Sequence, residues 1–533
     1  MRQTERIALV NGRVHTPSGL VDSIMLDSGR IAAVGAIPNM RFRDGARVFD
    51  LHGRTVLPGF CDSHVHLLRW AQTREQISLE GCRSVEELCT ALRAFAADHP
   101  APAGGWYQGY GWDLEGDAEP TRQDIDEALP GVPAILWRSC GHVAVVNTAA
   151  IEIAGITRDT RARSGAIQTG PDGEPDGILK EGAVSLVSRF LPRPGDEDLS
   201  RLLKKYGPLI AACGLTELCS DDLEIFGADF RRSQDFFMDA ALSGALPFRL
   251  RRQLRLPSGE LLPDLLADGW RSGDGIPFCQ VGPLKLVCDG SVGGRTALWR
   301  EDYSDAPGER GLALFDQEKL DRIILSAHMS GMQVAVHAVG DGAIDMCLAS
   351  FERAQERHPQ NLRHLLLHAQ TADGVQLDRM RRLRLGAVIR PDFIPSGHAM
   401  TAKRLGPDRT ARICRWRTML RGGGVISSGS GAPAGSLSPL DGIHAAVNRS
   451  TASGAGDLSE RLSIAEAIGT YTWSAAWNGH NEKRRGEIAQ GRDADIVVLD
   501  EDPFTVNPGD LADIGVAMTV CGGCITHISG LDG

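Results

Sequence analysis

The chain has 533 residues, a formal net charge of −11 and a hydrophobic content of 42%, a composition typical of ordinary globular proteins. The acidic balance argues against bulk binding of nucleic acid, which requires a basic surface. No run approaches the roughly 18 apolar residues of a transmembrane helix, and the N-terminus, Met1–Arg6, is not followed by the apolar segment of a secretory signal. The sequence therefore predicts a cytoplasmic protein that binds neither nucleic acid nor membrane.

Short strands separated by turns are predicted at both ends of the chain. At the N-terminus they span Ile7–Asn11, Ser23–Leu26, Ile31–Gly35 and Arg47–Leu51. At the C-terminus they span Ala494–Leu499, Gly515–Val520 and Ile525–Ile528. Because chain termini often lie close together, we expect residues 1–56 and 484–533 to form one small β-sandwich.

Apolar strands alternate with helices through residues 57–483, the pattern of a parallel α/β fold. Eight strands are predicted at Thr55–His66, Leu215–Asp221, Pro247–Leu254, Pro283–Asp289, Gln333–His337, Arg363–His368, Gly386–Arg390 and Gly424–Ser428. Helices are predicted at Leu199–Cys213, Glu318–Ser330, Gly342–Arg357, Val375–Leu385 and, from its capping box, Ser463–Trp477. The sequence thus predicts an α/β fold, a (β/α)8 TIM barrel with a small β-sandwich domain built from both chain ends.

One long stretch, at about residues 100–198, interrupts this pattern and is rich in Gly, Pro, Trp and Asp. We expect a long loop inserted over the C-terminal mouth of the barrel, because such loops in compact domains are usually functional. Its residues Trp106, Tyr110, Trp112 and His142 are candidates to line a substrate pocket. The alternative for each aromatic residue is packing of the insertion onto the barrel.

The 12 cysteines are scattered through apolar stretches, which indicates reduced, buried thiols rather than a disulfide framework. One pair, Cys521 and Cys524, has the spacing of a redox or zinc motif. Gly522 and Gly523 between them are typical of a tight turn between two β-strands. We therefore predict a hairpin here, with a metal knuckle as the alternative.

Polar residues end several of the predicted strands. His64 and His66 are two positions apart on an extended strand, so their imidazoles face the same side. His337 and His368 each end an apolar run, and Lys285 lies inside another. The C-terminal ends of barrel strands face one pocket, so these histidines can converge there on a metal such as Zn²⁺. The alternative for each histidine is a hydrogen-bonded core residue.

Lys285 is predicted to be buried, where an unpaired ammonium is costly and the pKa of the amine falls. A neutral amine can react with CO₂ to give a carbamate, an anion that can bridge two metal ions. The alternative is an ion pair with Asp289.

Together these motifs resemble the amidohydrolase superfamily and, more narrowly, its YtcJ-like branch, which includes N-substituted formamide deformylases. The resemblance runs along nearly the whole chain and rests chiefly on Leu57–His66, Leu284–Ser291, Val336–Ala343, Leu367–Gln370 and Gly491–Leu499. It implies one or two divalent metal ions, zinc first among them, held by His64, His66, His337 and His368 with Lys285 as the bridging ligand. It also implies hydrolysis of a C–N bond in a small amide, formamide or cyclic amide by metal-activated water. By family analogy we expect a homodimer.

The chain departs from the family pattern after the eighth strand, where Gly431 stands in place of an aspartate that ligates a metal and carries a proton. Losing such a general base costs about 10²–10⁴-fold in rate. Three hypotheses follow. Another group, His142 or Asp289, takes the proton; the metal serves only as a Lewis acid in a non-hydrolytic reaction; or the barrel binds a small ligand without hydrolysing it.

Further candidates for substrate contact lie around the predicted mouth. Arg295 could clamp a carboxylate or a carbonyl, and Phe393 could add an apolar wall beside Trp112 and His142. Glu181, in the insertion, matches a family signature and is a secondary candidate ligand. The leading hypothesis is a metal-dependent amidohydrolase acting on a small molecule, and the alternative is a catalytically divergent barrel.

Overall fold

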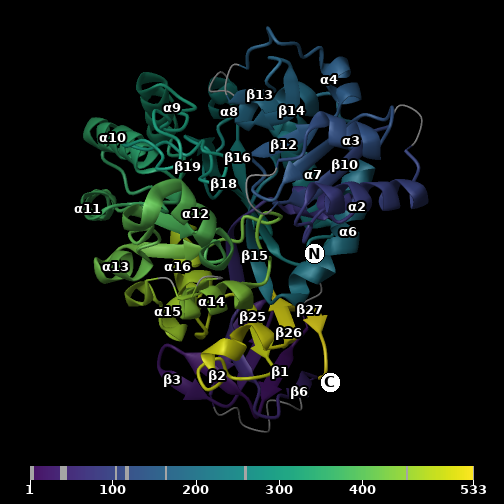
Figure 1. The fold of residues 1–533 in the computed structure, drawn as a ribbon. Coiled ribbons are helices and arrows are strands. Elements are labelled where there is room, and N and C mark those ends of the chain that lie inside the picture. Colours follow the sequence, from purple (N-terminus) through teal and green to yellow (C-terminus); the bar gives the residue numbers. More distant parts are fainter. Residues whose placement is uncertain are drawn as a thin grey trace.

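The computed structural model describes residues 5–35, 45–101, 105–114, 119–162, 165–256, 261–451, 454–455 and 457–531. Its centre is a nearly closed barrel of eight parallel strands, each paired with the next in chain order (Figure 1). These are β8 Phe60–Val65, β15 Leu215–Asp221, β16 Arg249–Arg255, β18 Cys279–Val287, β19 Val334–Ala338, β20 Leu365–His368, β21 Gly386–Ile389 and β22 Val425–Ser428. Nearly all their residues are buried, as in other parallel sheets covered by helices. The predicted (β/α)8 barrel is confirmed.

The barrel closes between its first and last strands through the residues that follow them. The amide of Gly431 donates to the carbonyl of His64 at 2.7 Å, and the amide of His66 donates to the carbonyl of Ala432 at 2.9 Å. These two bonds hold the ends of β8 and β22 together at the C-terminal mouth.

Helices connect successive strands and cover the outside of the barrel (Figure 1). They are α1 Leu67–Thr73, α6 Asp196–Ala212, α7 Phe230–Leu242, α8 Leu262–Ala267, α9 Gln317–Met329, α10 Asp341–Arg357, α11 Gly374–Arg382, α12 Phe393–Thr410, α13 Trp416–Arg421, α14 Pro439–Asn448, α15 Ile464–Tyr471 and α16 Trp473–Asn478. The predicted helix over Ser463–Trp477 is two helices, because Thr472 has a non-helical backbone (φ −125°, ψ −97°). Its predicted capping box, between Ser463 and Glu466, is present.

Two further sheets lie together at the base of the barrel in Figure 1, one built from the N-terminal segment and one from both ends of the chain. One sheet has the order β5-β4-β1-β6, from Arg30–Val34, Ile24–Asp27, Ile7–Val10 and Arg47–Asp50. The other has the order β27-β26-β25-β7-β2-β3, from Cys524–Ile528, Val516–Cys521, Ile496–Leu499, Thr55–Pro58, Arg13–Thr16 and Gly19–Val21. Since β7 pairs with β25, the first and last segments of the chain share one sheet, as the predicted fold requires.

The strand predicted over Thr55–His66 is divided at Gly59 into β7 and β8, which belong to different sheets. A Cβ atom at Gly59 would lie 2.3 Å from Oγ1 of Thr216 on β15. A residue without a side chain is therefore needed where the chain passes closely from the terminal sheet into the barrel.

The stretch expected as a long loop is instead a folded sheet, with the strand order β13-β14-β12-β11-β10-β9. Its strands are Ala166–Thr169, Pro175–Lys180, Val143–Val146, Ala134–Arg138, Tyr107–Trp112 and Ile77–Ser78, accompanied by α2 Val85–Asp98, α3 Arg122–Ala128, α4 Thr148–Ala154 and α5 Ser185–Ser188. Alternate residues of these strands pack into apolar clusters on the two faces of the sheet. Tyr107, Gly109, Tyr110, Gly111 and Trp112, part of the run that suggested a loop, are therefore strand residues.

The Cys521–Cys524 segment is the predicted hairpin, because β26 ends at Cys521 and β27 begins at Cys524. Gly522 and Gly523 between them have φ values of +59° and +77°, which suits a two-residue hairpin turn. All 12 cysteines lie among the described residues, and no disulfide bond is formed between them. Within the described part of the chain, no helix combines the length and apolar character needed to span a membrane.

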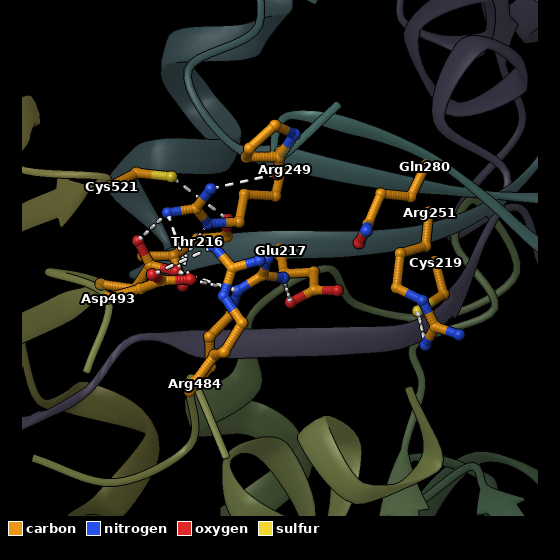
Figure 2. Close-up of polar contacts among 12 residues, drawn as sticks. Thr216, Glu217, Cys219, Arg249, Arg251, Gln280, Arg484, Asp493 and Cys521 are labelled. Atoms are coloured by element: carbon orange, nitrogen blue, oxygen red, sulfur yellow. Dashed lines mark hydrogen bonds and ion pairs between the residues drawn. The ribbon is translucent and has the colours of Figure 1, made fainter. Parts of the chain in front are cut away.

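A buried ion-pair network joins the base of the barrel to the segment that leads into β25 (Figure 2). Arg249 of β16 donates two hydrogen bonds to Asp495, of 2.7 and 3.0 Å. Arg485 donates to Asp493 at 3.0 Å and to Glu217 of β15 at 2.6 Å. All five side chains are at most 7% exposed. Removing one member of such a set leaves a buried charge unpaired, which is costly.

We expect Asp495→Asn to lower the free energy of unfolding by about 3–5 kcal/mol, because Arg249 loses its charged partner inside the protein. Asp500→Asn is the matched control, since its pair with Arg54 is more exposed (44% at Asp500). That exposed pair is worth less than about 1 kcal/mol. Chemical denaturation measures both losses, and equal losses would contradict the importance of the buried network.

Candidate metal centre

Two histidines at the end of β8 form one wall of the site. Nδ1 of His64 lies 3.0 Å from Oε1 of Gln253, and Nδ1 of His66 lies 2.9 Å from the backbone carbonyl of Asp221. A carbonyl can only accept, so Nδ1 of His66 carries the hydrogen and its Nε2 keeps a lone pair. Partners of this kind orient imidazole rings that bind a metal through the other nitrogen.

The other predicted ligands reach the same place from β18, β19 and β20. Nζ of Lys285 lies 3.3 Å from Nε2 of His64. The ring centroid of His368 lies 4.5 Å from that of His337 and 6.1 Å from that of His64. His368 has a φ of +72°, a strained conformation that is typical of functional sites. The structure thus gathers the four histidines and the lysine at the C-terminal mouth.

Burial controls the charge of this cluster. It lowers the pKa of His64, His337 and His368 well below the usual value and also lowers the pKa of His66. It lowers the pKa of Lys285 to about 7. The imidazoles are therefore neutral at neutral pH, as is a large share of the amine, and this is the form in which nitrogen binds a metal.

The cluster fits a divalent metal ion in the chemistry of its donors. Beside it, Oδ2 of Asp221 is buried without a hydrogen-bond partner, and Asp221 is the largest charge acting on the pKa of Lys285 and of His66. Among the described residues, however, no three His, Cys, Asp or Glu side chains already surround one point. Nε2 of His337 lies 3.0 Å from the carbonyl of Gly290, so His337 must give up that contact to bind a metal through Nε2.

His142, from the inserted sheet, approaches the cluster, and its ring centroid lies 5.2 Å from that of His337. Its Nδ1 lies 2.8 Å from Oε2 of Glu181, whose other oxygen accepts a 2.6 Å hydrogen bond from Thr296. Burial raises the pKa of Glu181, but the charge of His142 and the bonds from His142 and Thr296 outweigh it and hold that pKa below the usual value. Glu181 also has a strained φ of +52°. The carboxylate holds the Nδ1 hydrogen of His142 and leaves Nε2 available.

Asp289, the other candidate for proton transfer, has its carboxylate committed to the backbone. It accepts hydrogen bonds from the amides of Leu298, Val339 and Gly340 at 2.8–3.0 Å. Burial raises the pKa of Asp289 to about 7 against the effect of these bonds. Oδ1 lies 3.7 Å from Nε2 of His337, but the three amide bonds favour a role in holding the loops after β18 and β19.

Gly431 has a φ of +60°, and a Cβ atom there would lie 3.2 Å from Cδ and from Nε of Arg390. Arg390 follows β21 and was not singled out in the sequence. The pattern that identified the histidines, a polar residue directly after an apolar strand, could also have identified Arg390 as a candidate site residue. The structure therefore places a cation next to Gly431, the position at which the resemblance leads one to expect a carboxylate.

Three predicted substrate contacts have partners of their own outside the cluster. Trp112 is 2% exposed in the core of the inserted sheet and donates to the carbonyl of Leu136 at 2.9 Å. Arg295 is paired with Asp305, at 2.9 Å for its closest contact. Phe393 begins α12 and packs against the barrel core. Trp112 therefore packs within the inserted sheet, which is the alternative to substrate contact given in the sequence analysis.

Comparisons with known proteins agree with this geometry. The family model described as "Amidohydrolase family" matches residues 47–527. The chain is 32% identical to YtcJ of Bacillus subtilis (strain 168), which is named as an amidohydrolase, over 95% of this chain and 96% of that protein. It is 25% identical to the N-substituted formamide deformylase of Arthrobacter pascens, over 99% of each.

A solved structure supports the same assignment. The crystal structure of an uncharacterized metal-dependent hydrolase from Pyrococcus furiosus has a TM-score of 0.72 and 26% identity, over 94% of this chain and all of that one. The relatives indicate a hydrolase acting on a small molecule, and the family implies use of a divalent metal. The chain belongs to the amidohydrolase family and resembles its YtcJ-like branch.

Proposed function

We propose that this chain hydrolyses a C–N bond in a small amide, formamide or cyclic amide, with a divalent metal ion held at the mouth of the barrel. The observation that supports this most directly is the 3.3 Å approach of Nζ of Lys285 to Nε2 of His64, within a cluster of neutral histidines. This approach brings the donor nitrogen of His64 close to the amine that would become the carbamate of Lys285, which suits two ligands of one centre. The relative named as a formamide deformylase supports the bond class.

His64, His66, His337 and His368 would hold one or two ions, and their nitrogen donors favour Zn²⁺. When bound, the ion would lower the pKa of a water molecule and polarise the scissile carbonyl. Lys285 would contribute as a carbamate. Its neutral amine adds to CO₂, a proton is released, and the new N–C bond converts a buried amine into an anionic oxygen ligand.

His142 would carry the proton in place of the aspartate that Gly431 replaces. Its Nδ1–H is held by Glu181 at 2.8 Å, so Nε2 is the atom that accepts the proton of the attacking water and passes it to the leaving nitrogen. The carboxylate of Glu181 would stabilise the imidazolium that forms in between. Glu181 thus acts through His142 as a positioning residue.

We expect His337→Ala to reduce the metal content per chain and to lower kcat/KM by at least about 10²-fold, because a ligand nitrogen is lost. Elemental analysis of the purified protein and a formamide hydrolysis assay measure the two effects. His480→Ala is the control. That side chain contacts the carbonyl of Leu362, which precedes the N-terminal end of β20 and so lies at the end of the strand away from His368. Full metal content in a folded His337→Ala variant would remove His337 from the ligand set.

Glu181→Gln keeps the size of the side chain but removes its charge. We expect kcat to fall by about 10²-fold or more while the metal content stays unchanged, because proton transfer by His142 loses its anionic partner. Glu174→Gln, in the same inserted sheet and paired with Arg158, is the matched control. Loss of metal from Glu181→Gln would instead make Glu181 a ligand.

A second candidate function, ligand binding without hydrolysis, is favoured by one observation, the absence of a side chain at Gly431. Gly431→Asp separates the two candidates. If His142 carries the proton, Gly431→Asp gains no rate, and its carboxylate pairs with Arg390, which lies 3.2 Å from the Cβ position. If the barrel has lost catalysis, the variant creates hydrolysis that the wild type lacks. Gly431→Ala carries the same backbone strain at φ +60° and controls for it.

A further inference from the structure

Arg390 is a cation at the C-terminal mouth with one edge of its guanidinium committed. Nη2 donates to Oδ2 of Asp392 at 2.7 Å and to the carbonyl of Ala434 at 3.0 Å, and Nε lies 3.3 Å from Oδ1 of Asp392. These contacts fix the plane of the group. Among the described residues Nη1 makes no hydrogen bond, and the side chain remains 18% exposed.

The turn after β22 is shaped around this side chain. A Cβ atom at Gly431 would lie 3.2 Å from Cδ and Nε of Arg390 and 3.5 Å from Cζ. Contacts at 3.2 Å are tighter than ordinary van der Waals packing, so a side chain at residue 431 would press on the guanidinium. Glycine at residue 431 therefore leaves room for the side chain of Arg390.

Arg390 also lies next to the histidine cluster. The amide of Gly431, against which it packs, donates to the carbonyl of His64 at 2.7 Å. After burial, Arg390 is the largest influence that lowers the pKa of His368. Its charge also acts on Tyr110 of the inserted sheet, whose hydroxyl donates to the carbonyl of Ser139 at 2.6 Å. The guanidinium therefore lies within electrostatic reach of both the cluster and the inserted sheet.

We infer that Arg390 binds a carboxylate of the substrate, so that the site selects anionic amides of the N-acyl amino acid class over uncharged amides. The fixed guanidinium offers Nη1 as a charge-assisted donor that needs no reorganisation. Asp392 offsets part of the positive charge but lies on the opposite edge, where it holds the plane. This inference rests on the proposed function, because it assumes that the scissile amide lies at the histidine cluster.

The test compares two substrates that differ only in the carboxylate, N-formyl-L-leucine and N-formyl-3-methylbutylamine. We expect wild-type kcat/KM to favour N-formyl-L-leucine by about 10- to 100-fold, the value of a buried hydrogen bond between charged groups. Arg390→Met should remove this preference, so that the ratio of kcat/KM between the two substrates falls to about one, chiefly through a higher KM for the anion. Equal wild-type kcat/KM for both substrates, or a preference that survives in Arg390→Met, would overturn the inference.

Arg363→Met is the matched control, because Arg363 is similarly buried (14% exposed) and paired with Glu482 at 2.8 Å, but precedes β20 at the other end of the barrel. The wild-type comparison needs no variant and remains decisive if Arg390→Met does not fold. Thermal unfolding with each compound adds a readout that does not depend on turnover. If neither compound is hydrolysed, the formamide branch of the proposed function fails, and binding alone then tests Arg390. The inference about Arg390 then stands only if N-formyl-L-leucine alone raises the wild-type midpoint and does not raise that of Arg390→Met.

Discussion

The closure of the barrel between β8 and β22 is the constraint on which the site depends. Asp62, inside β8, accepts hydrogen bonds from the amides of His64 and Ser430, both of 3.0 Å, and from the hydroxyl of Ser430. Burial raises the pKa of this carboxyl to about 6, although the bonds from Ser430 and His64 oppose the rise. The same few residues therefore close the barrel, present the two histidines of β8 and set the turn that contains Gly431. A substitution among these residues would therefore change both the geometry of the site and the closure of the barrel.

The two ends of the barrel use buried charge in opposite ways. At the base, Arg249, Arg485 and their carboxylate partners neutralise one another through close pairs, and the charge of Arg249 holds the pKa of Asp495 below its usual value despite burial. At the mouth, burial lowers the pKa of Lys285 and the histidines, and Asp221 keeps an oxygen without a hydrogen-bond partner. Breaking a pair at the base would leave a buried charge unpaired, whereas the incompletely satisfied groups at the mouth suit a site that binds a ligand.

The sequence predicts features governed by local rules and misses those that depend on contacts between distant segments. His64, Lys285 and His368 could be placed in one pocket because the direction of parallel strands fixes which strand ends meet. The inserted sheet could not be predicted, because glycines such as Gly109, which packs tightly against Leu136, are typical of loops when read alone. The division of one predicted strand at Gly59 likewise follows from its close approach to Thr216.

Arg390 illustrates a feature that sequence patterns do not reveal. Its role depends on its contact with Gly431, which lies 41 residues further along the chain, after another strand. Read alone, the glycine is only the loss of a carboxylate. Read with the arginine, it leaves a cation beside the histidine cluster, where the resemblance implies an anion. On the proposed function, ions held by neutral imidazoles would then keep more of their positive charge, and the carbamate of Lys285 would supply one of the few anions. An anionic substrate complements such a mouth, because its carboxylate restores charge balance that the chain itself no longer provides.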